Sequence, residues 1–246
     1  MTGVRVDRVN KVDVIAITAL RQLFGSGRVK RRVNRVKLDG AGVGPDAGAI
    51  YPIEERRVKC DPFPIPSYWP RAYAMDVGWN WTAGLWGAWD RDTSTLYIYS
   101  EYKAGEQLPQ IHAQAFTARG AWIPGIIDPA ANGRAQKDGE ALKASYEGCG
   151  LKLTNAINAV EAGLHECWMD LSVGRIRVFS TLPGFFNEYR LYRRDEHGKI
   201  VKKNDHLMDC MRYLRMTGPG LAIVKPAVLS GSMPGLNVRN PGVGGY

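Results

Sequence analysis

Short apolar runs separated by turn residues, between positions 71 and 180, constrain the fold of this chain most strongly. Three runs come first, and the polar stretch DRDTST between the second and third predicts a three-stranded antiparallel meander. Helix-like periodic segments then alternate with further apolar runs. Because this order is typical of an α/β domain, we predict a mixed β-sheet flanked by helices. The predicted strands are AYAMDVG, AGLWGAWD, LYIYSEY, WIPGIID, LKLTN and RIRVFS, and the predicted helices cover 108–119, 138–147, 158–171, 183–192 and 205–216, with Asn158 as the N-cap of the third helix.

Composition divides the chain into three parts. Residues 1–50 contain the basic run RVKRRVNRVK and the glycine-rich stretch GAGVGPDAGA, which we interpret as a basic segment followed by a linker. The glycine pattern lacks the lysine and hydroxyl residue that complete a phosphate-binding loop. Residues 51–217 form the predicted folded domain, whose proline-rich beginning, 52–70, we expect to be extended rather than helical. Residues 218–246 are rich in glycine and proline and are predicted to be an irregular tail.

The balance of charge is basic. Among 246 residues, 33 lysines and arginines against 24 aspartates and glutamates give a net charge of +9, which favours a polyanionic partner such as nucleic acid. No apolar stretch is long enough to span a membrane, and the N-terminal apolar stretch does not resemble a signal peptide. The four cysteines lie far apart without a paired motif. We therefore expect reduced thiols and a cytoplasmic protein without a membrane partner.

Three aspartates are the candidate catalytic residues. Asp76 and Asp128 each end a predicted strand, where a carboxylate is costly to bury unless a cation meets it; the alternative for each is an ordinary turn or cap residue. Asp205 and Asp209 share one face of the last predicted helix and repel each other. Either Asp205 is the N-cap of this helix or both carboxylates face a cation. Arg212, one turn after Asp209, is the alternative partner for that acid.

Carboxylates that converge from separate elements provide the oxygen ligands that Mg²⁺ and Mn²⁺ prefer. Open α/β sheets bind ligands outside the carboxyl ends of their strands, where Asp76 and Asp128 are predicted to lie. His206 precedes Asp209 by one helical turn and is either a ligand or proton shuttle of the same site or a surface residue. An acid on the first strand, one on the fourth and one on a C-terminal helix is the layout of ribonuclease H-like nucleases. The pattern therefore predicts phosphodiester hydrolysis assisted by two metal ions.

A basic hairpin that turns at HGK is the candidate DNA-binding element. Its side chains would contact phosphates without reading sequence; the alternative is a solvated basic turn. The nearby tryptophans at 79, 81, 86 and 89 we interpret as packing residues rather than as a surface that stacks on bases. The candidate DNA-binding residues are Arg190, Arg193, Arg194, Lys199, Lys202 and Lys203.

From about Ala47 to Thr217, the chain resembles the C-terminal nuclease domain of the large terminase subunit of tailed bacteriophages. The stretches AIYPIEERRV, AMDVGWN, NAINAVEAGL and NEYRLYRRDEHGKIVKKNDHLMDCMRYL carry the resemblance. It implies a ribonuclease H-like fold that cuts double-stranded, concatemeric viral DNA with two divalent ions during genome packaging, in the host cell cytoplasm. It also implies metal-binding roles for Asp76, Asp128 and Asp209, with Asp205 as an auxiliary ligand and His206 near the metals.

One motif of a full large terminase is not found in this sequence. The packaging ATPase of that family carries a G-x-x-x-x-G-K-S/T loop, and no segment here matches it. We therefore expect an isolated nuclease domain, a truncated gene product or a split subunit, and we assign no motor activity to it. The resemblance implies a packaging ATPase, a small terminase subunit and a portal as partners. The alternatives are a Holliday-junction resolvase or ribonuclease H of the same fold, and a non-catalytic DNA-binding or docking module.

Overall fold

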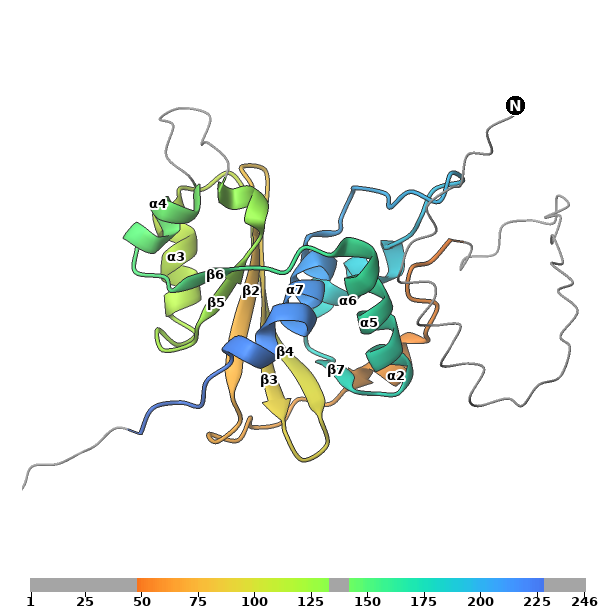
Figure 1. Cartoon of the computed structure of the whole chain (residues 1–246), viewed down its shortest axis with the longest axis horizontal. Helices are drawn as coiled ribbons and strands as arrows, with labels where there is room; N and C mark the ends of the chain where they lie inside the picture. Colours follow the sequence, from red (N-terminus) through yellow and green to blue (C-terminus); the bar gives the residue numbers. More distant parts are fainter. Residues whose placement is uncertain (1–47, 133–141, 228–246) are drawn as a thin grey trace, which may run out of the picture. The chain divides into compact units, whose positions relative to one another are not determined.

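The computed structural model describes residues 48–132 and 142–227. This part of the chain forms a mixed seven-stranded sheet, in the order β1-β7-β4-β3-β2-β5-β6, with helices against both faces (Figure 1). The predicted α/β class is thereby confirmed. The strands are β1 (Lys59–Cys60), β2 (Arg71–Val77), β3 (Thr82–Asp90), β4 (Thr95–Ala104), β5 (Gly125–Ile127), β6 (Leu153–Asn155) and β7 (Ile176–Phe179). The helices are α2 (Glu55–Val58), α3 (Pro109–Thr117), η1 (Pro129–Asn132), α4 (Leu142–Gly148), α5 (Val160–Ser172), α6 (Pro183–Leu191) and α7 (His206–Leu221).

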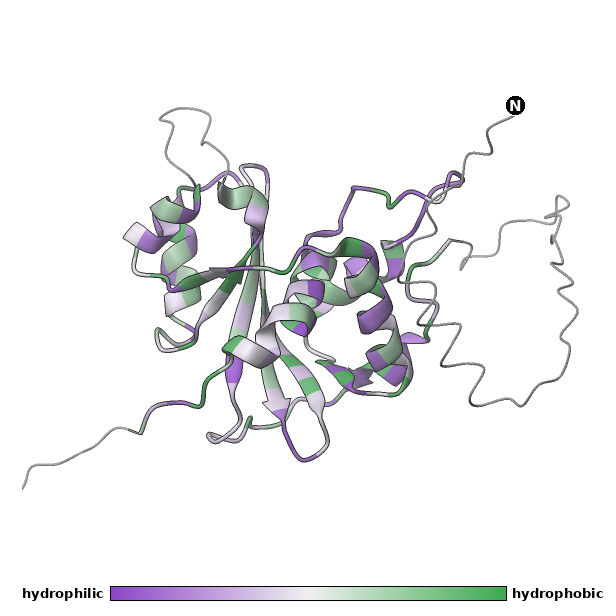
Figure 2. Cartoon of the chain, in the orientation of Figure 1, coloured by the Kyte–Doolittle hydropathy of each residue, from purple (hydrophilic) through white to green (hydrophobic). Residues whose placement is uncertain are grey.

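The centre of the sheet is the predicted meander. Strands β2, β3 and β4 pair antiparallel, and the polar turn between β3 and β4 contains Ser94 with a φ of 56°. Figure 2 shows this turn as hydrophilic and the strands behind it as largely apolar. Strand β5 then pairs with β2 in parallel, with Met75 opposite Ile127. The carboxyl ends of β2 and β5 therefore lie at the same edge of the sheet.

The alternation of side chains along the strands decides which helices cover which face. Tyr73 and Met75 belong to one core, which packs against α3 and α4, whereas Ala72 and Ala74 belong to another, which packs against α5, α6 and α7. Figure 1 shows these two helix groups on opposite sides of the sheet. Because side chains two residues apart on a strand share a face, Asp76 lies on the same face as Ala74, which is the face that α7 covers.

The structure differs from the sequence predictions at two boundaries. The proline-rich lead-in contains a short helix, α2, and a strand, β1, that pairs in parallel with β7, whereas we expected it to be extended throughout. Helix α7 continues to Leu221 rather than ending at 216. Gly218 is buried against Trp89, where a Cβ would lie 2.5 Å from the indole ring, so packing extends the helix despite Pro219.

Several predictions concern residues outside the described part. These are the basic run and most of the glycine-rich stretch in 1–47, the beginning of the helix predicted from 138, and residues 228–246 of the predicted tail. Among the helices that the structure describes, none combines the length and apolar character needed to cross a membrane.

Candidate active site

Two parallel strands bring Asp76 and Asp128 to one edge of the sheet. Asp76 is the second-last residue of β2, opposite Ala83 of β3, and Asp128 follows the last residue of β5. The backbone N–H of Asp128 donates to the carbonyl oxygen of Met75 at 3.3 Å, which fixes the two strand ends side by side. The Asp128 carboxylate also accepts from the backbone N–H of Ala130 at 3.1 Å. Asp128 therefore makes the contact of an ordinary turn residue, which was the alternative to a catalytic role. It also lies at the sheet edge beside the end of β2, where the proposed site needs an acid.

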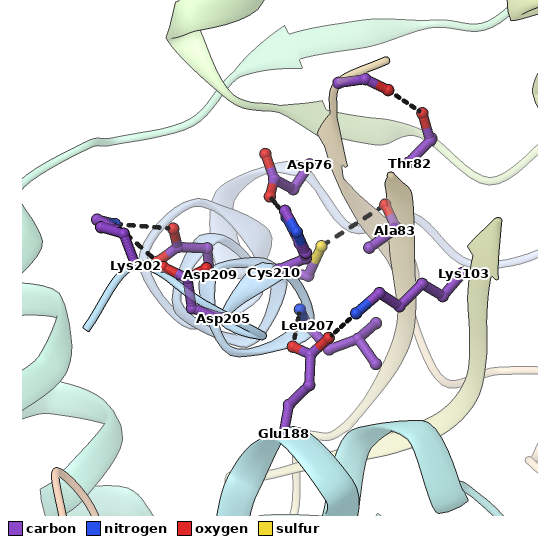
Figure 3. A network of polar contacts seen from close by, with 12 residues as sticks. Asp76, Thr82, Ala83, Lys103, Glu188, Lys202, Asp205, Leu207, Asp209 and Cys210 are labelled. Carbon is purple, nitrogen blue, oxygen red and sulfur yellow. Dashed lines mark hydrogen bonds and ion pairs between the residues drawn. The ribbon is translucent and has the colours of Figure 1, made fainter. Parts of the chain in front are cut away.

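Helix α7 brings the remaining candidate residues to the same edge. His206 Nδ1 donates to Asp76 Oδ2 at 2.7 Å. Lys202 lies in the segment just before α7, and its Nζ is 3.3 Å from Asp205 Oδ2 and 3.6 Å from Asp209 Oδ2 (Figure 3). All three carboxylates are recessed, with side-chain exposures of 17% for Asp76, 10% for Asp205 and 12% for Asp209. The fold thus joins residues that are far apart in sequence into one acidic cluster.

The charges at this edge influence one another. Burial raises the pKa of Asp76, the His206 hydrogen bond opposes this rise, and the negative charges of Asp209 and Asp128 add to it. The pKa of His206 is raised, mainly by its hydrogen bond to Asp76. Burial lowers the pKa of Lys202, but the negative charges of Asp209 and Asp205 outweigh burial, so that the net shift is upward. Asp76, Asp128 and Asp209 therefore share one electrostatic environment.

Asp209 also forms an ion pair with Arg212, the alternative partner expected from the sequence. Arg212 is buried and donates to Asp209 Oδ1 at 2.9 Å from Nη2, while its Nη1 donates to Asn158 Oδ1 at 3.0 Å. This second contact corrects a prediction: Asn158 does not cap α5, which begins at Val160 without a side-chain cap. His206 contacts Asp76, Lys202 contacts Asp205 and Asp209, and Arg212 contacts Asp209. Even with His206 counted as a cation, the four carboxylates of this edge outnumber their three cationic partners, so the cluster retains an excess of negative charge.

The acidic cluster has the ligand type and the charge that a divalent cation needs, but its side chains are not arranged around a common point. Within the two described ranges, no three histidine, cysteine or acidic side chains are grouped closely enough to hold an ion. The contacts above explain why, because Asp76 faces His206 whereas Asp209 faces Arg212 and Lys202. Carboxylate oxygens are nonetheless the donors that Mg²⁺ and Mn²⁺ prefer. Binding an ion would require Asp76 and Asp209 to turn an oxygen away from these protein partners.

Sequence reasoning missed Glu188, a buried acid on α6. Its Oε2 accepts from the backbone N–H of Leu207 at 2.6 Å, and its Oε1 accepts from Lys103 Nζ at 2.6 Å (Figure 3). The Glu188 side chain therefore caps the start of α7. Asp205 occupies the N-cap position, one of the two alternatives considered for it, but its side chain makes no capping hydrogen bond. A signal was present in the sequence: Glu188 follows Phe185 at helical spacing and so falls on an apolar face.

The six candidate DNA-binding residues have different surroundings. Antiparallel pairing of Arg194 with Ile200, and Gly198 with a φ of 76°, form the predicted turn. Arg190 pairs with Glu55, Arg194 pairs with Glu161, and Lys202 pairs with the acidic cluster. Arg193, Lys199 and Lys203 are exposed and form no ion pair with any residue that the structure describes.

The four tryptophans divide into two pairs. Trp86 is buried and Trp89 is partly buried, as predicted for packing residues. Trp79 and Trp81 are exposed and do not belong to the core, although the Trp81 ring contacts Lys103.

Comparison with known proteins finds terminase large subunits of bacteriophages. No protein-family model matches it. Over 180 residues it is 35% identical to the terminase large subunits of Enterobacteria phage LP7 and Salmonella phage P22. The match covers 68% of this chain but only 37% and 35% of those proteins. The chain thus spans little more than a third of the length of these relatives.

Solved structures agree with the sequence comparison. The structure of the P22 large terminase nuclease domain superposes with a TM-score of 0.64 at 34% identity, over 72% of this chain and 95% of that domain. The large terminase of a thermophilic bacteriophage, in complex with ADP, superposes with a TM-score of 0.60 at 23% identity, over 69% of this chain and 44% of that protein. The second likeness concerns the fold alone.

Proposed function

This chain belongs to the family of large terminase nuclease domains, and we propose that it cuts double-stranded DNA in a reaction that depends on divalent metal ions. The observation that carries the proposal is the acidic cluster at the sheet edge. Four carboxylates from β2, the end of β5 and the start of α7 meet there with too few cations to neutralise them. Such an excess is unfavourable unless a further cation binds.

Asp76, Asp128 and Asp209 would hold the metal, with Asp205 as an auxiliary ligand. A bound divalent ion, Mg²⁺ or Mn²⁺ and by family resemblance a pair of them, would activate water and stabilise charge on the phosphate. The residues of this chain position the acids. His206 Nδ1 orients the Asp76 carboxylate, and Arg212 holds one oxygen of Asp209 while its other oxygen faces Lys202. Glu188 anchors the helix that carries Asp209.

The basic turn before α7 would hold the DNA backbone. Arg193, Lys199 and Lys203 are exposed and unpaired within the described chain, so they are the first candidates for phosphate contacts. Arg190 and Arg194 would have to exchange Glu55 and Glu161 for phosphate, and Lys202 would have to leave the acidic cluster. Binding through these residues should weaken steeply as salt rises.

The longer relatives suggest the biological setting. Their name, terminase large subunit, supports the proposal that this domain cuts concatemeric viral DNA during packaging in the host cytoplasm. A packaging ATPase, a small terminase subunit and a portal would be its partners. These assignments concern the whole protein, and they go beyond the nuclease domain itself.

The test is incubation of the purified full chain with plasmid DNA in Mg²⁺, Mn²⁺ or EDTA, beside Asp76→Asn. We expect metal-dependent nicking and linearisation by the wild type, and none by the variant. A four-way junction and an RNA–DNA hybrid, offered in separate reactions, distinguish a resolvase or ribonuclease H. Cutting of none of the substrates in any metal would favour a non-catalytic module, and equal cutting by Asp76→Asn would place the active site elsewhere.

A further inference from the structure

Two exposed tryptophans lie immediately beyond the catalytic strand. Trp79 and Trp81 occupy the turn between β2 and β3, three and five residues after Asp76, and they are 68% and 47% exposed. Most large aromatic side chains of the described domain are buried or partly buried. Two neighbouring indoles in water are unfavourable for the isolated domain, so this turn requires a further explanation.

The turn that carries the tryptophans is firmly held. The backbone N–H of Glu106 donates to the carbonyl oxygen of Trp79 at 2.9 Å, and Thr82 Oγ1 donates to the carbonyl oxygen of Gly78 at 3.3 Å. Gly105 packs so closely that a Cβ there would lie 1.9 Å from the carbonyl oxygen of Asn80. The backbone is therefore built to present these side chains in one place, rather than to let them move freely.

The same turn lies at the acidic edge of the sheet. Val77 pairs with Thr82, so the turn closes the end of β2 at which Asp76 lies. Beneath Trp81, Lys103 Nζ lies 5.1 Å from the centre of the indole ring, a cation–π contact. Lys103 also holds Glu188, which caps the helix that carries Asp209. Trp81 is thus joined to α7 through three successive contacts, by way of Lys103 and Glu188.

The recessed position of the acids suggests what the tryptophans bind. Carboxylates with 10–17% exposure are reached more easily by the backbone of a locally distorted duplex than by that of a straight, stiff one. Distortion of that kind unstacks a base step, and proteins stabilise such a step by placing an apolar or aromatic side chain against it. An indole stacks on any base, so it suits an enzyme without sequence readout.

We propose that Trp79 and Trp81 form an aromatic platform that stacks on bases unstacked next to the scissile phosphate. The proposal rests on the DNA-cutting function above and adds a second DNA-binding element, apolar rather than basic. The partner is the base face of DNA. A protein partner at this edge is the competing explanation, and the test separates the two.

The test measures binding of the full chain to two fluorescein-labelled duplexes by anisotropy in EDTA. One duplex is fully paired and the other contains a central two-base mismatch, whose bases are already partly unstacked. We expect wild type to bind the mismatched duplex more tightly. Trp79→Ala and Trp81→Ala should each weaken that binding about tenfold, and Trp81→Phe should retain most of it. Trp168→Ala, which removes a 39% exposed tryptophan from α5, is the matched control and should bind as wild type does.

Cleavage kinetics and folding complete the test. If the platform acts in distortion of the duplex, both alanine variants should cut mismatched DNA with a higher KM, and their thermal unfolding should match wild type. If wild type cuts plasmid but both alanine variants bind the two duplexes as wild type does, the platform is overturned and the nuclease assignment stands. Absence of cutting by wild type, with tryptophan-dependent binding preserved, would overturn the nuclease assignment alone.

Discussion

Helix α7 carries residues of two ionic clusters, each built around a buried aspartate, that differ in their balance of charge. Towards its start, Asp205 and Asp209 join Asp76 and Asp128 in the acidic cluster, where carboxylates outnumber permanent cations. Further along, Arg215 enters what we call the Asp170 cluster, made of Asp170, Glu166, Arg175 and Arg215. In the Asp170 cluster each carboxylate contacts a guanidinium group: Arg175 lies 2.6 Å from Asp170, and Arg215 contacts Asp170 and lies 2.8 Å from Glu166.

The comparison teaches that burial of an acid does not by itself mark an active site. Asp170 and Asp209 are both buried aspartates, and each contacts an arginine. The Asp170 cluster contains as many guanidinium groups as carboxylates, so its charge is already compensated and a structural role suffices. The acidic cluster is not compensated, and that imbalance is the physical reason to expect a bound cation there.

The largest expected effect is loss of cutting on neutralising the acidic cluster. Asp209→Asn should lower the rate of plasmid cleavage in Mn²⁺ by about 1000-fold, because in the proposed site Asp209 would hold the metal that stabilises charge on the reacting phosphate. The thermal unfolding temperature without metal should also fall, because buried Arg212 loses its carboxylate partner, although relief of repulsion among the remaining acids offsets part of that loss. A large drop in unfolding temperature with unchanged cutting would reverse the roles that we assign to the two clusters.

The counterpart in the Asp170 cluster should affect stability instead. Asp170→Asn leaves two arginines without their shared partner and should lower the free energy of unfolding by about 2–3 kcal/mol, less than for a fully buried pair because both arginines are partly exposed. Cutting per folded molecule should be unchanged. Urea unfolding followed by circular dichroism measures the first quantity, and plasmid cleavage measures the second. A catalytic defect in fully folded Asp170→Asn would contradict the comparison.

Glu188 connects the acidic cluster to the rest of the fold, and its replacement should have a smaller effect. Glu188→Gln keeps the shape but weakens the cap of α7 and the Lys103 pair, so we expect kcat to fall about 10- to 100-fold with little change in KM. The binding of Mn²⁺, measured by calorimetry, should weaken in parallel. Lys103→Met should reproduce part of the defect. If Glu188→Gln changes the unfolding temperature but neither kcat nor Mn²⁺ binding, Glu188 has a structural role only.

The smallest expected effect concerns Lys202, whose charge compensates part of the acidic cluster. Lys202→Met should strengthen Mn²⁺ binding about fivefold, because the ion no longer competes with a partly exposed ammonium group for Asp205 and Asp209. Calorimetry with Mn²⁺ measures the change, and Lys199→Met, on the same basic turn, is the control and should have no effect. Weaker binding in Lys202→Met would mean that this lysine supports the site rather than opposing the metal.

Local pattern was sufficient for most of the fold. Each predicted strand is present, because apolar runs bounded by turn residues have few other ways to bury their side chains. Helix ends were predicted less well. Asn158 and Asp205 are residue types that commonly cap helices. The Asn158 side chain instead accepts a hydrogen bond from Arg212, and the side chain that caps α7 is that of Glu188 rather than Asp205. A cap depends on which donor is nearest in space, and spacing along the chain does not contain that information.

The sequence by itself determined the α/β class, the strands that end in Asp76 and Asp128, and the helix face that carries Asp205 and Asp209, because these follow from side-chain periodicity. Only the tertiary structure decided which charges meet. It pairs Asp76 with His206, places Lys202 beside Asp205 and Asp209, anchors α7 with Glu188, and leaves Trp79 and Trp81 in water. The physical reason is range: periodicity acts within a few residues, whereas charge balance and burial are summed over every element that packs around a point.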